Sequence, residues 1–369
     1  MSTIASSLRV VIAPDSFKGS LNAVDLSNAL ATGWRSVRPH DDVVLLPQAD
    51  GGEGTLEAIV SVEEHATWKQ IDSVRGPDQR AVTGRWLSLD NGTAVIELAQ
   101  TSGLPLMKRL DAGGATTAGL GQVIAGALDD GAASLVIGLG GSASTDGGAG
   151  ALRALGARLL DRQGRHIAEG GAALADLHTV DLTDMRTAPA AGVQLLTDTT
   201  AVLCGPNGAA QVFAGQKGAS PLERSELNDA LAHFAGCLGK VADIDPQAPG
   251  SGAAGGTAFG LAAWGATIVP GAARIAQLTR LDTEFGRADV ILTGEGRFDD
   301  TSLTGKLVGS VLQRCIETGT RSIVVAGQIT TDPQTLAVSL TDLAGSSEQA
   351  LANPVHWARV AAAKAANAV

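Results

Sequence analysis

The sequence predicts an α/β fold made of two α/β domains, one with a Rossmann-like parallel sheet and one with a mixed sheet. Three observations lead to this prediction. Short runs of Val, Ile and Leu alternate with helix-like segments, which is typical of parallel strands joined by crossover helices. One region instead contains consecutive strands joined by tight turns. The chain of 369 residues is also long for a single hydrophobic core.

The first elements repeat the order strand, loop, helix. Residues 8–15, LRVVIAPD, form a β-branched run closed by Pro and Asp, which predicts a buried strand. Apolar residues at helical spacing predict a helix over 21–37. A second strand over 42–47 leads into a glycine-rich loop and a helix over 54–62.

The middle of the chain changes character. Residues 68–98 hold three strand-like runs joined by RGPDQ and DNG, and these turns predict an antiparallel sub-sheet. Alternation then resumes as helix 116–131, strand 134–141, helix 147–156, strand 192–198 and, near the C-terminus, strands 287–296 and 321–328. The expected domains are therefore a discontinuous Rossmann-like one, 1–70 with 285–369, and a second one, 71–284, that contains the antiparallel sub-sheet.

Composition limits the partners. The net charge of −11 and the pI of about 5.0 argue against nucleic acid or an anionic membrane as the main partner. The three cysteines lie far apart, and the six histidines form no HExxH pair, so neither a disulfide framework nor a zinc site is predicted. A reducing cytoplasm fits this composition best.

Two apolar stretches resemble targeting or membrane segments only superficially. The N-terminal MSTIASSLRVVIAP lacks a basic n-region, so we do not expect a signal peptide. The uncharged stretch Gly250–Ala273 is long enough for a membrane span, but its composition predicts a glycine loop, a buried helix and a strand.

Five loops follow predicted strands, and each of them pairs an acid with glycine or a small hydroxyl residue. Ligands of open α/β sheets bind beyond the carboxyl ends of the strands, so these loops are expected to face one cleft. The loops are APDSFKGS, PQADGGEGT, GLGGSASTDGGAG, LTDTTAVLCGPNGAA and LTGEGRFDD.

Acids beside glycine amides suit a nucleotide phosphate chelated by Mg²⁺. The amides bind phosphate oxygens, while one or two carboxylates reach the hydrated metal. Ordinary turn formation by Asp and Gly is the alternative for any single loop. The candidate acids are Asp50, Glu53, Asp146, Glu295 and Asp299.

Four further side chains are candidates for the chemistry. Lys18, in the loop after the first strand, offers positive charge to a phosphate or small carboxylate, and Lys217 has a similar claim. Asp198 ends a strand, where a carboxylate can accept the proton of an attacking hydroxyl or can cap a turn. Arg297 offers a forked donor to a carboxylate or to the moving phosphoryl group.

Two nucleotide motifs were also compared with the sequence. The pair Gly305-Lys306 lacks the leading glycine and the Ser or Thr of a Walker A motif. GLGGSA, residues 138–143, does match G-x-G-x-x-A, with Asp161 near the position of a ribose-binding acid. An NAD(P)- or flavin-dependent oxidoreductase is therefore an alternative, although Asp146 at the helix start would repel a pyrophosphate.

Six segments together resemble the glycerate kinase type 1 family in order and spacing. The match runs from about Val10 to Asn353, which is nearly the whole chain. Six motifs in one order are far more specific than any one of them. The segments are IAPDSFKGSL, PQADGGEGT, GLGGSASTDGGAG, LCGPNGAAQVFAGQKGA, GSGAAGG and TGEGRFD.

The resemblance implies ATP- and Mg²⁺-dependent phosphorylation of D-glycerate, usually to 2-phosphoglycerate, in a cleft between two α/β domains. Combined with the residue chemistry, it gives Asp198 and Lys18 as catalytic residues. The predicted metal ligands are Asp50, Glu53 and Asp299. The predicted substrate residues are Asp15, Ser16, Lys18, Asp50, Gly51, Gly52 and Arg297, and those for the nucleotide are Gly140, Gly141, Ser142, Asp146, Lys217 and Glu295.

The sequence also departs from the family pattern. Ala201-Val202 stands where relatives usually have Asn-Pro, which removes an amide and a rigid turn close to the proposed base. Thr301 stands where Gln is common, and Ser144-Thr145 replaces the usual Thr-Asn. A kinase relative that only binds a small acid is therefore a third hypothesis. A homodimer is compatible with the sequence, which does not fix the oligomeric state.

Overall fold

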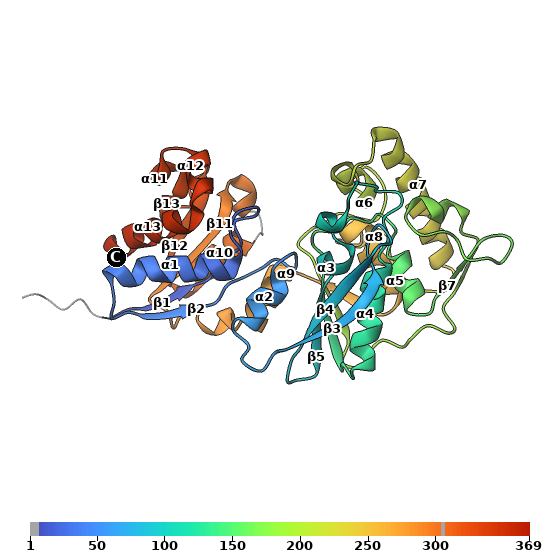
Figure 1. Ribbon diagram of the computed structural model, residues 1–369, viewed down its shortest axis with the longest axis horizontal. Helices are drawn as coiled ribbons and strands as arrows, with labels where there is room; N and C mark the ends of the chain where they lie inside the picture. The colour runs from blue at the N-terminus through green and yellow to red at the C-terminus, as the bar shows by residue number, and fades with distance from the viewer. Residues whose placement is uncertain (1–6, 304–306) are drawn as a thin grey trace, which may run out of the picture. The chain divides into compact units, whose positions relative to one another are not determined.

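The computed structural model describes residues 7–303 and 307–369, which divide into two compact units (Figure 1). Unit 1 comprises Met1–Asp50, Glu57–Glu64 and Ala272–Val369, and unit 2 comprises Gly51–Leu56 and His65–Gly271. Each unit is built on its own sheet, and unit 1 takes strands from both ends of the chain. The domain bounds expected from the sequence stay a prediction.

The sheet of unit 1 is entirely parallel, with the strand order β13-β12-β11-β1-β2. The direction of the strand order reverses between β1 and β11, which makes this pair a topological switch point, where ligands of doubly wound sheets bind. The strands are β1 (Arg9–Ile12), β2 (Asp42–Leu45), β11 (Val290–Phe298), β12 (Arg321–Ile329) and β13 (Leu336–Ser339).

Helices cover both faces of this sheet. Val10 and Ile12 share a core with α1 (Ala23–Val37) and α13 (Pro354–Asn367), which lie side by side in blue and red in Figure 1. Val11 shares the opposite core with α10. Successive residues of a strand point to opposite faces of the sheet. Because helices cover both faces of β1, the side chains of Val10, Val11 and Ile12 are all buried, which explains its continuous apolar run. The remaining helices include α9 (Gly271–Leu278), α10 (Leu307–Thr318), α11 (Leu340–Ala344) and α12 (Ser347–Ala352).

The sheet of unit 2 is mixed, with the strand order β10-β9-β6-β5-β4-β3. β4 pairs antiparallel with β3 and β5, whereas β5, β6, β9 and β10 are parallel neighbours. The predicted antiparallel sub-sheet and the mixed α/β fold class are thus confirmed. The strands are β3 (Thr67–Arg75), β4 (Ala81–Ser88), β5 (Thr93–Glu97), β6 (Ser134–Gly138), β9 (Val193–Leu196) and β10 (Ala266–Val269).

The helices of unit 2 pack around one large core. α8 and β10 occupy most of the uncharged stretch 250–273, as the sequence predicts. Within the described ranges, no helix combines the length and the apolar character that crossing a membrane needs. The chain passes from unit 2 to unit 1 within α2 (Thr55–Val60). The other helices of unit 2 are α3 (Ala99–Ser102), α4 (Ala118–Asp129), α5 (Ala149–Ala154), α6 (Ala209–Phe213), α7 (Pro221–Leu238) and α8 (Ala253–Ala263).

Two local expectations were wrong. LTGEGRFDD is not a loop up to its aspartates, because β11 continues to Phe298 and pairs with β12 as far as Ile329. The dinucleotide-binding alternative needs a βαβ unit after GLGGSA. Instead, α5 leads to β7 (Arg158–Leu160), which pairs antiparallel with β8 (Thr179–Asp181) outside the main sheet.

The backbones of α1 and α13 are in contact at Gly33. A Cβ atom at this position would lie 2.1 Å from the carbonyl oxygen of Arg359, which is far inside van der Waals contact. The facing residues Ala358, Ala361 and Ala362 are fully buried. Only glycine leaves room for this backbone approach.

We predict that Gly33→Ala lowers the free energy of unfolding by about 1–3 kcal/mol, because the helices must separate to admit the methyl group. Gly236→Ala is the matched control, since a Cβ at that position in α7 meets nothing within 4 Å. The control should raise the free energy of unfolding by up to about 1 kcal/mol through helix propensity. Urea denaturation measures both variants, and a Gly33→Ala protein as stable as the parent would contradict the packing argument.

Candidate active site

The loop after β1 is held against β11 at the switch point of unit 1. The amide of Asp15 donates to the Gly294 carbonyl at 2.8 Å, and Thr293 Oγ1 donates to the Ala13 carbonyl at 2.9 Å. A Cβ on Gly296 would lie 3.5 Å from Phe17 Cα, so the two backbones run in contact. This arrangement brings the first and last predicted motifs together.

Acids and one lysine form a cluster at this edge. Lys18 Nζ lies 3.4 Å from Asp50 Oδ2, and the Asp50 carboxylate raises the pKa of Lys18. Burial, followed by the charge of Asp50, raises the pKa of Asp15 to about 7, while Lys18 opposes this shift and Glu295 adds to it. A carboxyl group that titrates near neutral pH is suited to proton transfer.

The other predicted residues of unit 1 flank the cluster. The Ser16 amide donates to Asp15 Oδ1 at 2.7 Å. Arg297, exposed near the end of β11, has its Nε 3.4 Å from Asp299 Oδ2. Asp299 Oδ1 also accepts hydrogen bonds from the amide and hydroxyl of Thr301, at 3.0 and 2.6 Å. Arg297 and Asp299 thus sit on a strand end and the turn that follows it.

The glycines of two predicted motifs pack backbone against backbone in unit 2. The Gly140 amide donates to the Gly51 carbonyl at 3.2 Å. A Cβ on Gly138 would lie 2.3 Å from Gly51 O, and one on Gly140 would lie 2.4 Å from Gly52 Cα. Close loop packing therefore explains these glycines without a ligand, and their predicted binding roles stay predictions.

Asp146 is fully buried and joins the starts of two helices. Its carboxylate accepts hydrogen bonds from the Thr117 amide and hydroxyl, at 2.9 and 2.7 Å, and from the amides of Gly148 and Gly150. Burial raises the pKa of Asp146, and these donors oppose the shift. The contacts give Asp146 a structural role that needs no nucleotide or metal.

Four of the predicted nucleotide residues border one small hollow in unit 2. Gly140, Gly141, Ser142 and Lys217 line this space of about 170 Å³. Lys217 is 2% exposed, and its Nζ donates to Ser142 Oγ at 2.8 Å and to the Ser144 carbonyl. Burial lowers the pKa of Lys217 to about 7. Its GQKG context indicates an exposed helix end, so this burial could not be predicted from the local sequence.

Asp198 follows β9 on an exposed loop. Its Oδ1 accepts a hydrogen bond from the amide of Gly271, the first residue of α9, at 2.8 Å. The sequence left open whether this aspartate caps a turn or serves as a base. The structure shows a contact with the start of a helix far along the chain, and the catalytic role stays a prediction.

The predicted metal ligands are distributed over two units. Asp50 and Asp299 belong to unit 1, and the exposed Glu53 belongs to unit 2. Across residues 7–303 and 307–369, no three His, Cys, Asp or Glu side chains gather as a metal site. The donor chemistry nevertheless fits Mg²⁺, which uses one or two carboxylates together with phosphates and water. Burial and then repulsion by Asp50 raise the pKa of Asp15, and a bound cation would relieve the repulsion.

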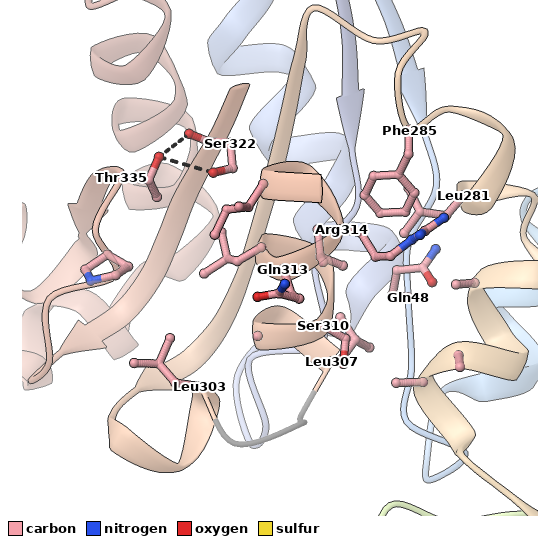
Figure 2. Close-up of a pocket in the computed structure, with 18 of the residues that line it drawn as sticks. Gln48, Leu281, Phe285, Leu303, Leu307, Ser310, Gln313, Arg314, Ser322 and Thr335 are labelled. Atoms are coloured by element: carbon pink, nitrogen blue, oxygen red, sulfur yellow. Dashed lines mark hydrogen bonds between the residues drawn. The ribbon is translucent and has the colours of Figure 1, made fainter. Parts of the chain in front are cut away.

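A larger hollow of about 750 Å³ lies in unit 1 beside α10 (Figure 2). Its wall is mainly aliphatic, and Arg314 stacks on Phe285 with 5.5 Å from guanidinium to ring centre. Gln48 Nε2 donates to Thr279 Oγ1 at 2.7 Å, and Thr335 Oγ1 donates to the Ser322 carbonyl at 2.6 Å. Gln48 and Thr335 thus have hydrogen-bond partners within the protein, and none of the predicted site residues lines this hollow.

Asp161 closes a tight turn, where it accepts from Arg165 Nε at 3.0 Å and from the Gln163 amide at 2.8 Å. It therefore has a local role in place of the ribose contact that the dinucleotide alternative required. Gly305-Lys306 lies outside the described residues.

Comparison with known proteins identifies the family. The profile of the Glycerate kinase family matches residues 10–369. The glycerate 2-kinase of Escherichia coli K12 is 38% identical over 336 residues, which cover 88% of this chain and 86% of that protein. The glycerate kinase of Halalkalibacterium halodurans is 39% identical over 331 residues, which cover 87% of this chain and 85% of that protein.

A solved structure agrees with these relatives. The crystal structure described as glycerate kinase 2 from Salmonella typhimurium LT2 superposes with a TM-score of 0.85 at 34% identity and covers 98% of both chains. The similarity therefore extends over nearly the whole length of both chains. The chain is therefore a kinase and belongs to the glycerate kinase family.

Proposed function

We propose that this protein transfers the γ-phosphoryl group of ATP to a hydroxyl of D-glycerate and that the product is 2-phosphoglycerate. The observation that carries the proposal is the family match over residues 10–369, which spans every residue of the predicted site. The relative from Escherichia coli is named for this reaction. The candidate acids, together with Lys18 and Lys217, supply the charged groups that phosphoryl transfer needs.

The reaction makes one bond and breaks one bond. The substrate hydroxyl oxygen attacks the γ-phosphorus, the bond to the β,γ-bridging oxygen breaks, and ADP leaves while the hydroxyl proton passes to a base. When bound, Mg²⁺ would neutralise phosphate charge, and Asp50, Glu53 and Asp299 would hold it directly or through water. Lys18 and Arg297 would orient the carboxylate of the substrate.

Two carboxylates compete for the role of base. Asp198 has the predicted position after a strand, and Asp15 has a pKa of about 7, which matches proton transfer at neutral pH. We assign Asp198 as the base and Asp15 to substrate binding. Gly140, Gly141, Ser142 and Lys217 would bind the nucleotide from unit 2.

A coupled assay tests the proposal directly. We expect ADP release from MgATP only when D-glycerate is present, and phosphorus NMR of the product should show 2-phosphoglycerate. Addition of EDTA should stop the reaction because the triphosphate charge is then uncompensated. L-glycerate is the control substrate. ADP release that ignores D-glycerate would reject the assignment, and a 3-phosphoglycerate signal would correct the phosphorylated position.

Replacement of Asp198 separates its two roles. Asn keeps the oxygen that accepts from Gly271 but is not a base, whereas Ala removes both functions. We expect Asp198→Asn to lower kcat by about 100-fold or more while ATP binding and thermal stability persist. Asp245→Asn is the control, because Asp245 Oδ1 likewise accepts an amide hydrogen bond, from Gln247 at 2.8 Å. If Asn retains full turnover and only Ala fails, Asp198 is a helix cap and not the base.

The pKa of Asp15 predicts a pH-dependent stability. The folded protein holds this proton more tightly than the unfolded chain between the ordinary pKa of 3.8 and about 7. Stability therefore falls as the pH rises through that window, and Asp15→Asn should remove this loss. We expect a higher melting temperature for Asp15→Asn than for the parent at pH 8 and a smaller difference at pH 5. Asp332→Asn, at an exposed turn of the same unit, should show no such trend.

A further inference from the structure

Lys217 is an unusual residue to find fully inside a protein. Its side chain is 2% exposed, and the two oxygens that accept from its Nζ belong to a hydroxyl and a peptide carbonyl, which are neutral. A buried ammonium group is costly unless an anion accompanies it. The charge of Asp146 raises the pKa of Lys217, but the Asp146 carboxylate already accepts four hydrogen bonds from other groups.

The space beside Lys217 has the size and the lining for a small anion. The hollow of about 170 Å³ is too small for a whole nucleotide and large enough for one carboxylate or phosphoryl group. Its other walls include the backbone of Gly140 and Gly141 and the threonines Thr197 and Thr199. It lies beyond the carboxyl ends of β6 and β9, which are parallel neighbours in the sheet.

Backbone strain is stored at the same place. Ala254 lines the hollow with φ 53° and ψ 42°, which is the left-handed region that a non-glycine residue rarely adopts. Gly255 and Gly256 continue the left-handed turn, and a Cβ on Gly255 would lie 2.1 Å from the Ser144 carbonyl oxygen. That carbonyl is also an acceptor for Lys217. Residues in this conformation are enriched at active sites and ligand-binding sites.

We propose that this hollow binds one small oxyanion, a carboxylate or a phosphoryl group, with Lys217 Nζ as its cationic donor, and that Lys217 takes up a proton as the anion enters. The binding follows from the geometry of unit 2. Only the assignment of the anion to a reactant, D-glycerate or the nucleotide, rests on the proposed function.

The proton uptake has a defined direction. Because burial lowers the pKa of Lys217 to about 7, the amine is mostly neutral at pH 8 in the anion-free protein. A bound anion favours the charged form and raises the pKa again. Affinity for an anion of constant charge should therefore be level below pH 7 and fall about tenfold per pH unit above it.

Sulfate is the probe, since its charge is constant across this range. Titration calorimetry from pH 6 to 9, in two buffers of different ionisation heat, measures affinity and protons taken up. We expect uptake approaching one proton at pH 8. Lys217→Met should lose the uptake and at least tenfold in affinity, and Lys240→Met, at an exposed lysine of the same unit, should retain both. A sulfate affinity that changes neither with pH nor in the Lys217→Met variant would overturn the proposal.

A second measurement needs no variant. Carbon-13 spectra of labelled lysines in the parent protein should show one side chain that titrates near neutral pH and shifts to higher pH with sulfate. Absence of such a signal would also overturn the proposal. Competition by D-glycerate and by metal-free ADP then identifies the reactant that shares the hollow. Glycerate-dependent ADP release without these anion effects would reject this inference alone and leave the kinase assignment in place.

Discussion

Direct contact between glycine backbones is the constraint on which the described site of unit 2 depends. Gly51 and Gly52 lie against Gly138 and Gly140 at distances that exclude any Cβ atom, and Gly255 meets the Ser144 carbonyl in the same way. These contacts place the loop after β6 so that Ser142 and Ser144 reach Lys217. Close approach of the backbones is thus sufficient to explain why these positions are glycine.

The two lysines of the candidate site illustrate opposite uses of positive charge. Lys18 is exposed among carboxylates, which raise its pKa and keep it charged at any physiological pH. Lys217 is buried and donates to neutral oxygens, and burial lowers its pKa to about 7 against the opposing charge of Asp146. Lys18 of unit 1 is therefore a permanent cation among carboxylates, whereas the charge of Lys217 in unit 2 depends on the pH. An enzyme that handles several anions gains selectivity when its cations respond differently.

The sequence predicted most of the fold because the relevant signals are local. Hydrophobic runs and turn residues predicted the strands, and the DNG turn predicted the antiparallel hairpin. The continuation of β11 to Phe298 escaped prediction, since it depends on pairing with β12. Motifs predicted the candidate site residues, but they did not predict the surroundings of those residues. The burial of Lys217 and the raised pKa of Asp15 arise from segments far away in the chain, which no local pattern encodes.

The two halves of the unit 1 sheet come from opposite ends of the chain, and this has a consequence for biosynthesis. Val10 pairs with Val290, and the Thr293 hydroxyl reaches Ala13 across 280 positions of sequence. The parallel strands β1 and β2 therefore cannot pair with β11 until nearly all of the polypeptide has been synthesised. The intervening 65–271 segment contains all its own strands and can condense first. The architecture therefore requires that the first strands of the nascent chain be protected during this delay.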